Sequence, residues 1–259
     1  MNAPVRLEHD GGLAVATIDS PPLNLFDQPL WDALDGAISE LEAREPRAVL
    51  FRADGRVVSG GVDVSLFAAR EGVEDARALF DGLVSLTRRV ERLECPVVFA
   101  AHALCLTWAF ELALACDLIV AAESAAFGLV ETVVGLTPAM GGTQRLAERA
   151  GSGRAREFVM TGRPFDAATM ERWGVVNRVL PDGEFDREAR ALAALLAAGP
   201  TRAHAATKRV IRHYLDGGID EADREVGAIA GSLFATSDLQ NAVRTFLEQG
   251  PGKATFEGR

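Results

Sequence analysis

The sequence predicts an α/β protein in which parallel strands are connected by helices. Short apolar runs rich in Val, Ile, Phe and Ala are typical of buried strands and occur at 47–53, 97–102 and 118–123. Segments with apolar residues at helical spacing lie between them. Strands that alternate with helices need crossover connections, which place the strands parallel in one sheet.

The chain begins with a strand, a turn and a helix. LAVATID (13–19) is rich in strand-forming residues, and PPLN (21–24) ends it with a turn. A helix is expected over about 27–43, with Pro29 suited to its first turn. Its apolar face is made by Leu30, Leu34, Ile38 and Leu41.

Two further helices are expected in the first half of the chain. The turn VSGGVD (58–63) precedes a long helix over about 72–94, which Pro96 ends. Its apolar stripe consists of Leu79, Leu83, Leu86, Val90 and Leu93. Residues 107–116 are expected to form another helix, directly before the strand at 118–123.

The second half of the chain is expected to be mostly helical after about residue 138. Residues 161–180 contain one helix and end in the strand-like VVNRVL. The Ala-rich segment 187–215 is helical with an interruption at Gly199-Pro200, and 238–249 forms a final helix.

Composition limits the classes of function. Of 259 residues, 48% are hydrophobic and 25% charged, and the formal net charge is −10 with a pI of about 5.0. An acidic chain is a poor candidate for binding nucleic acid or an anionic membrane surface. The start of the chain lacks the apolar stretch of a signal peptide, and no uncharged run reaches the roughly 18 residues of a membrane span.

The cysteines point to the cytoplasm. Cys95, Cys105 and Cys116 are an odd, sparse set without the spacing of metal ligands. Such a set is typical of reduced thiols in a cytoplasmic protein. We expect no metal site and no disulfide.

Glu111 is the most unusual residue of the sequence. It lies inside the apolar run TWAFELALACDLIV (107–120), where an isolated carboxylate is costly unless it is paired or has a raised pKa. A second acid, Glu131, follows twenty positions later. Backbone N–H groups at the 58–63 turn and at the start of the 107–116 helix lack local partners and favour a negative oxygen nearby.

Several ordered motifs resemble the crotonase, or enoyl-CoA hydratase/isomerase, family. They are VSGGVDVSLF (58–67), FELALACDLIVAAESAAFGLVETVVGLTPAMGGTQRL (110–146), TGRPFDAATMERWGVVNRV (161–179) and SDLQNAVRTFLEQ (237–249). The resemblance implies a spiral of ββα units with a CoA-thioester site over residues 1–197. It also implies a C-terminal helical region over 198–259 that builds a homotrimer or a hexamer made of two trimers.

The resemblance assigns roles to four residues. The backbone N–H groups of Val62 and Trp108 would hold the thioester oxygen as an oxyanion hole. Glu111 would take a proton from water as it attacks the β-carbon, and Glu131 would protonate the α-carbon. Neither a metal nor a redox cofactor is implied, and coenzyme A enters as part of the substrate.

The resemblance also implies eight further residues that contact the substrate. The positions are Gly60, Gly61, Asp63, Leu25, Phe26, His102, Lys253 and Phe256. The sequence also departs from the family pattern. Thr107, Trp108 and Ala109 replace a run of glycines, His102-Ala103 replaces Asn-Gly, and Ser65 replaces a frequent basic residue. These changes leave the family resemblance intact and bear on the substrate and on the reaction.

The favoured interpretation is an enoyl-CoA hydratase that acts on a 2-enoyl-CoA. The alternatives are an enoyl-CoA isomerase that uses Glu131 alone, a C–C bond hydrolase or lyase of the same family, and a non-catalytic acyl-CoA binder. Structural roles are also open: Glu111 as a buried partner of an Arg or Lys, and Glu131 as a surface residue.

Overall fold

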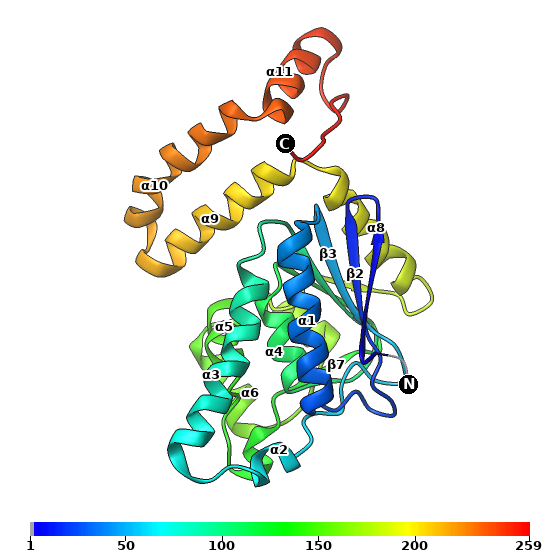
Figure 1. Ribbon diagram of the computed structural model, residues 1–259, viewed down its shortest axis with the longest axis vertical. Coiled ribbons are helices and arrows are strands. Elements are labelled where there is room, and N and C mark those ends of the chain that lie inside the picture. Colours follow the sequence, from blue (N-terminus) through cyan, green and yellow to red (C-terminus); the bar gives the residue numbers. More distant parts are fainter. Residues whose placement is uncertain (1–2) are drawn as a thin grey trace.

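The computed structural model describes residues 3–259 and has an α/β core with a helical C-terminal region (Figure 1). The main sheet has the strand order β1-β2-β3-β4-β6-β9. Its strands are β1 (Val5–Asp10), β2 (Leu13–Ile18), β3 (Ala48–Ala53), β4 (Val97–Ala101), β6 (Leu118–Ala122) and β9 (Arg178–Leu180). Strand β1 is antiparallel to β2, and all the other neighbours are parallel, as crossover connections require.

The crossover helices agree with the apolar periodicity. They are α1 (Gln28–Arg44), α3 (Gly72–Glu91) and α4 (Trp108–Ala115), with the short α2 (Ser65–Ala68) before α3. The side chain of Asp27 accepts a hydrogen bond from the Leu30 N–H and so caps α1, whose first turn contains Pro29. Helix α3 ends at Glu91, three residues before the expected boundary.

A small second sheet places the loops of the candidate site. It consists of β5 (Cys105–Leu106), β7 (Ala126–Gly128) and β8 (Phe165–Asp166). Strand β5 leads into α4, and β7 leads to the 3-10 helix η1 (Glu131–Val134). Ser59 forms a bridge with Cys105, so the turn at 58–63 joins the same edge.

The remaining elements cover the core or extend from it. They are α5 (Gly142–Ala150), α6 (Ser152–Thr161), α7 (Ala167–Arg172), α8 (Phe185–Ala198), α9 (Thr201–Gly217), α10 (Ile219–Ser232), η2 (Leu233–Ala235) and α11 (Ser237–Gln249). The break between α8 and α9 falls at Gly199 and Pro200, as expected. Across residues 3–259, no helix combines the length and apolarity needed to cross a membrane.

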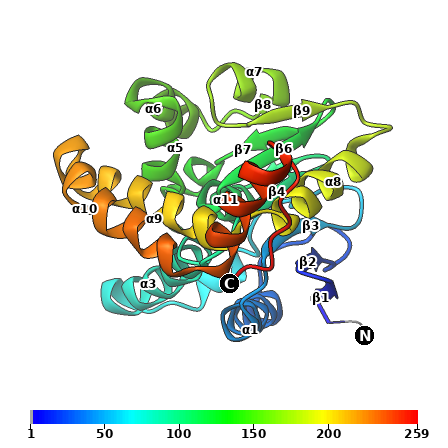
Figure 2. The same cartoon turned by 90° about the horizontal axis from the view of Figure 1, so that it is seen from above.

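Helices α9, α10 and α11 extend away from the sheet, at the top of Figure 1, and α9 and α10 lie side by side in both views (Figures 1 and 2). Large apolar side chains on these helices are exposed. The exposed apolar surface of the arm consists of Ile211, Tyr214, Leu215, Ile219, Val226, Phe234, Val243, Phe246 and Leu247. The chain after α11 returns to Asp238, whose carboxylate accepts the N–H groups of Glu257 and Gly258 at 2.8 Å.

All three cysteines are free thiols buried in the core. Burial raises the pKa of Cys95 to about 12 and raises the pKa values of Cys105 and Cys116 even further. Each thiol is therefore protonated and screened from solvent at neutral pH.

Candidate active site

Glu111 lies in α4, a helix in which every residue is buried, and is itself 3% exposed. Its Oε2 accepts hydrogen bonds from the backbone N–H groups of Met140 at 2.8 Å and Gly142 at 2.7 Å. Gly142 is the first residue of α5, so the carboxylate faces the positive end of that helix. Glu111 thus occupies the position of a cap for a helix that begins 31 residues further along the chain.

Glu111 is not the partner of a cation. The nearest candidate, Arg145, instead pairs with Glu91 at 2.8 Å. Within the described residues, no Lys or Arg forms an ion pair with Glu111. Backbone amides alone hold one of its two oxygens, and the ion-pair role considered from the sequence does not occur in this structure.

Because Gly142 has no side chain, the Glu111 carboxyl group can lie directly against the start of α5. A Cβ at this position would lie 2.6 Å from Glu111 Cγ, a distance at which the atoms would overlap. The preceding Gly141 has φ of +101°, a conformation that favours glycine. The glycine pair in AMGGTQ is the sequence signal for this contact, although its partner is not local.

Both acidic side chains have raised pKa values. Burial, reinforced by the charge of Glu131 and opposed by the N–H groups of Gly142 and Met140, raises the pKa of Glu111 to about 8. Burial raises the pKa of Glu131 to about 7. Two carboxyls that repel one another titrate as a pair, so near neutrality this pair retains about one proton.

Glu131 begins η1 and is partly buried. Its Oε2 is buried and finds no hydrogen-bond partner among residues 3–259. A buried carboxyl oxygen without a partner is costly, so it is available to a ligand or a water molecule.

Glu111 and Glu131 line the same cavity, which has a volume of about 30 Å³. That space suits one or two water molecules. Apart from Thr137, the rest of the wall is apolar: Phe26, Val62, Leu66, Phe67, Leu79, Phe80, Leu83, Trp108, Leu136, Ala139 and Met140. The two acids therefore face a small space with mostly apolar walls, in which electrostatic interactions are strong.

The indole of Trp108 forms part of this wall and is fixed in place. Trp108 is 2% exposed, and its Nε1–H donates to the Asn24 carbonyl at 3.2 Å. Its ring packs against Phe26 with 5.3 Å between ring centroids. The large residue that replaces a glycine of the family pattern thus fills space next to the carboxyl pair.

Two backbone N–H groups are available at the cavity. Phe26 donates its N–H to the Gly61 carbonyl and accepts the Asp63 N–H, which leaves the Val62 N–H between these bonds without a protein partner in the described chain. The Trp108 N–H is at the first position of α4, where no intrahelical acceptor exists. Both Val62 and Trp108 line the cavity.

Thr107, the residue directly before Trp108, has an unusual backbone conformation. It has φ of 49° and ψ of −119°, although β-branched residues rarely adopt positive φ. Such backbone strain costs on the order of 1–3 kcal/mol and is concentrated at functional sites. The Gly61 N–H donates to Ser59 Oγ at 2.9 Å, which fixes the facing loop.

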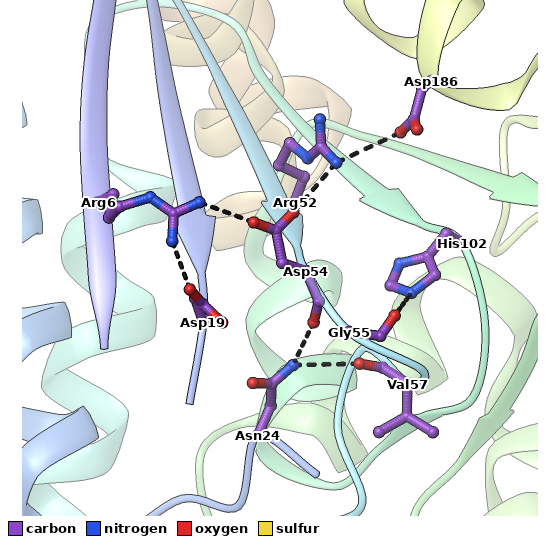
Figure 3. A network of polar contacts seen from close by, with 9 residues as sticks. All are labelled: Arg6, Asp19, Asn24, Arg52, Asp54, Gly55, Val57, His102 and Asp186. Carbon is purple, nitrogen blue, oxygen red and sulfur yellow. Dashed lines mark hydrogen bonds and ion pairs between the residues drawn. The ribbon is translucent and has the colours of Figure 1, made fainter. Parts of the chain in front are cut away.

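Asn24 is not part of the cavity wall, and its side chain instead binds backbone carbonyls of the segment 54–57 (Figure 3). Its Nδ2 donates to the carbonyls of Asp54 at 3.0 Å and Val57 at 3.1 Å, and its Oδ1 accepts the Ser20 N–H at 2.7 Å. Since its own carbonyl holds the Trp108 indole, Asn24 positions a cavity wall. Its place in the PPLN turn was visible in the sequence, but this role was not.

Not all of the expected substrate contacts come together. Gly60, Gly61, Asp63, Leu25 and Phe26 lie on the two loops bridged by Phe26 and Val62, with Phe26 in the cavity wall.

The other three expected contacts lie elsewhere. His102 is not part of the cavity wall, and its Nε2 instead forms a hydrogen bond with the Gly55 carbonyl at 3.0 Å (Figure 3). Lys253 and Phe256 follow α11 in the tail and also do not line the cavity of their own chain.

The fold and the site define a class: an α/β protein whose second sheet brings a buried acid, a partly buried acid and two free amides to one mostly apolar cavity. The enoyl-CoA hydratase/isomerase family model matches residues 8–259. The chain belongs to this family, which acts on acyl-CoA thioesters, and the resemblance noted in the sequence is confirmed.

Individual relatives agree with this assignment. The chain is 31% identical to the short-chain-enoyl-CoA hydratase of Clostridium acetobutylicum, with 95% of each chain covered. It is 34% identical to the carnitinyl-CoA dehydratase of Salmonella heidelberg, with 87% of each covered. The crystal structure of an enoyl-CoA hydratase from Bacillus anthracis superimposes with a TM-score of 0.90 at 25% identity, covering 99% of this chain and 100% of that one. The expected crotonase-like fold is therefore confirmed.

Proposed function

We propose that the protein is an enoyl-CoA hydratase that adds water to a 2-enoyl-CoA. One observation carries the proposal: Glu111 and Glu131 line one water-sized cavity and together hold about one proton near neutrality. Hydration needs one group that accepts a proton and one that donates a proton, both beside the same water.

The two carboxyls divide the proton transfers. The reactive form of the pair carries its proton on Glu131, and it is the less populated form because the pKa of Glu111 is the higher of the two. In that form the carboxylate of Glu111 takes a proton from water, and the water oxygen bonds to the β-carbon. The resulting enolate oxygen is stabilised by the N–H groups of Val62 and Trp108, each worth about 3–4 kcal/mol in comparable sites. Glu131 then donates its proton to the α-carbon, and the pair regains its starting state by exchanging one proton between its members. This scheme uses neither a metal nor a redox cofactor, because the pair supplies both transfers.

The first prediction concerns both acids. We expect Glu111→Gln and Glu131→Gln each to lower kcat for hydration of crotonyl-CoA by at least about 100-fold, since each removes one acid–base step. Loss of absorbance of the conjugated thioester measures the reaction. Full activity in both variants would overturn the two-acid mechanism.

The proposed reaction also has a characteristic pH dependence. The active pair carries one proton, so kcat/KM is expected to fall on both sides of a maximum between pH values of about 7 and about 8. A profile of kcat/KM from pH 5 to pH 10 tests this expectation, and a flat profile would contradict it.

An isomerase is the second candidate, and the unpartnered Oε2 of Glu131 favours it. One free carboxyl suffices to move a proton between two carbons of a 3-enoyl-CoA. In that case Glu111→Gln retains most of the turnover of a 3-enoyl-CoA, while Glu131→Gln does not. This pattern of losses separates the two reactions.

We also propose that residues 198–259 assemble the chain into a homotrimer or a pair of trimers in the cytoplasm. The exposed apolar surface of the arm supports this assembly, because isolated chains rarely expose so many large apolar side chains. The free thiols are in keeping with a reducing compartment. Analytical ultracentrifugation tests the assembly, and a stable monomer at micromolar concentration would refute it.

A further inference from the structure

Thr107 lies between the two loops that carry the proposed amide donors. It directly precedes Trp108, and its side chain faces Gly61, the residue directly before Val62. A Cβ built on Gly61 would lie 3.7 Å from Thr107 Oγ1 and 3.9 Å from Thr107 Cγ2. The hydroxyl group therefore lies beside the residue that precedes Val62, on the residue that precedes Trp108, and directly behind the part of the cavity wall that Val62 and Trp108 form.

This hydroxyl is buried and unsatisfied. Thr107 is 5% exposed, and its Oγ1 has no hydrogen-bond partner anywhere in residues 3–259. A buried hydroxyl without a partner costs free energy, and such groups generally have an acceptor in the functional state. Here the free amides beside it already attract a negative oxygen, which would also serve as that acceptor.

Neither packing nor backbone geometry accounts for threonine at this position. A φ of 49° favours glycine, and the volume of the side chain would be supplied equally well by valine. The hydroxyl is the one property that neither residue offers.

We propose that Thr107 Oγ–H donates a third hydrogen bond to the thioester oxygen, beside the N–H groups of Val62 and Trp108. The bond strengthens as the carbonyl oxygen becomes an enolate, so it contributes to the reaction more than to binding. The inference rests on the proposed function for the thioester as ligand, but it does not depend on hydration as the reaction.

Three variants separate the hydroxyl from the backbone. We expect Thr107→Val to lower kcat for crotonyl-CoA roughly 10- to 100-fold with little change in KM, below the loss typical of a principal oxyanion-hole donor. Thr107→Ser keeps a hydroxyl and should recover most of the lost activity. Thr107→Gly relieves the positive φ and should fold at least as well as the wild type, yet it should be slowed like the valine variant.

A matched control is available in the main sheet. Thr17 in β2 is also 5% exposed, and Thr17→Val should leave kcat and KM unchanged. If Thr107→Val fails to fold, Thr107→Gly provides the same test. Wild-type kcat in Thr107→Gly, or in a folded Thr107→Val, would overturn the proposal.

A second measurement does not need turnover. Hydrogen bonds to a carbonyl lower its stretching frequency, so we would bind butyryl-CoA labelled with ¹³C at the thioester carbon and record difference infrared spectra. Thr107→Val should move the labelled band to a higher frequency than in the wild type, and Thr107→Ser should restore it. An unmoved band in Thr107→Val would overturn the proposal.

The two proposals fail in different ways. A wild type that hydrates no enoyl-CoA, with a band that moves in Thr107→Val, would refute the hydratase and retain the third donor. An active wild type whose Thr107→Val variant has unchanged kcat and an unmoved band would retain the hydratase and refute the third donor.

Discussion

Glu111 is held in place by backbone N–H groups, and its burial also raises its pKa. One of its oxygens is held by the N–H groups of Met140 and Gly142, while its helix is buried on all sides. These bonds stabilise the carboxylate but do not compensate fully for its burial, so its pKa remains raised to about 8. Ionisation of Glu111 at high pH therefore lowers the stability of the folded protein, and the same burial makes its carboxylate more basic than an exposed one.

The stability of the protein should depend on pH through this residue. The pKa of Glu111 is raised from 4.5 to about 8, so the folded state binds its proton more tightly than the unfolded state. The associated stability is complete below pH about 4.5 and is lost as pH rises through about 8.

Thermal melting should reveal this dependence. Between pH 5 and pH 9 we expect Tm to decrease less in Glu111→Gln than in the wild type, because the glutamine oxygen still accepts both amides and carries no charge. Parallel curves would contradict the role of burial. Glu131, whose pKa is also raised, remains in both proteins, so some decrease of Tm with rising pH is expected in the variant as well.

Trp108 has the largest side chain in the cavity wall. Its indole is held by Asn24 and Phe26 and lies in the same wall as both acids, so it limits the space beside them. We therefore expect a preference for short acyl groups. Trp108→Ala should raise kcat/KM for a ten-carbon enoyl-CoA relative to crotonyl-CoA by about 10-fold or more, since a large side chain is removed and the amide donor remains.

The assay for Trp108→Ala needs two comparisons. Replacing a buried tryptophan by alanine costs about 3–5 kcal/mol of stability, so kinetics belong well below the Tm of the variant. Trp108→Phe retains an aromatic ring and should keep the short-chain preference. An unchanged preference in Trp108→Ala would show that another part of the wall limits chain length.

At the scale of elements, the start of α5 positions the acid of α4. The contact is so close that a Cβ at Gly142 would lie 2.6 Å from Glu111 Cγ. Gly142→Ala should displace this carboxyl and lower kcat at least about 10-fold, through the loss of a positioned base.

Gly153, in α6, is the matched control for that variant. A Cβ there meets nothing within 4 Å, so Gly153→Ala should keep full activity and gain about 0.5–1 kcal/mol of stability. Kinetics and thermal melting of the two variants test the contact together. Equal activity in both would contradict it.

Elements with strong local patterns could be predicted, and contacts between distant elements could not. The stripe that begins at Leu79 identified α3, and Gly199-Pro200 marked the break before α9. Strand β1 was not assigned, because VRLEHD is partly polar and exposed at the edge of the sheet. Helix α10 also lacked a separate assignment, since it has only one buried residue, Ala222, and so a weak core-facing stripe.

In the candidate site, too, local features could be predicted from the sequence, and contacts with distant residues could not. Glu111 was conspicuous in its apolar run, but its amide partners are about thirty residues away and have no local signature. The bulk of Trp108 was evident, whereas the direction of its ring depends on Asn24 and Phe26. His102 has apolar neighbours in sequence, yet the loop after β4 directs it to Gly55.

At the scale of the whole molecule, the arm formed by α9, α10 and α11 has apolar side chains that its own chain leaves uncovered. Val243, Phe246 and Leu247 lie on one face of α11 at helical spacing and are 51%, 58% and 79% exposed. A second copy of this chain is the partner that we propose for this surface.

Charges on that face should separate the subunits. We expect the double variant Phe246→Glu, Leu247→Glu to sediment as a monomer, because buried unpaired carboxylates oppose association. Val73 lies in α3, outside the arm, and is 80% exposed, so Val73→Glu should leave the assembly intact. If the double variant keeps the mass of the wild-type assembly, the proposed interface is wrong.

The buried thiols make the protein convenient for spectroscopic labelling. Since Cys95, Cys105 and Cys116 are inaccessible and protonated, maleimide reagents should leave the native chain untouched until it unfolds. A cysteine introduced on the surface, for example on the arm, would then be the sole reactive group. Fluorophores attached there could follow subunit exchange in real time without first removing any native residue.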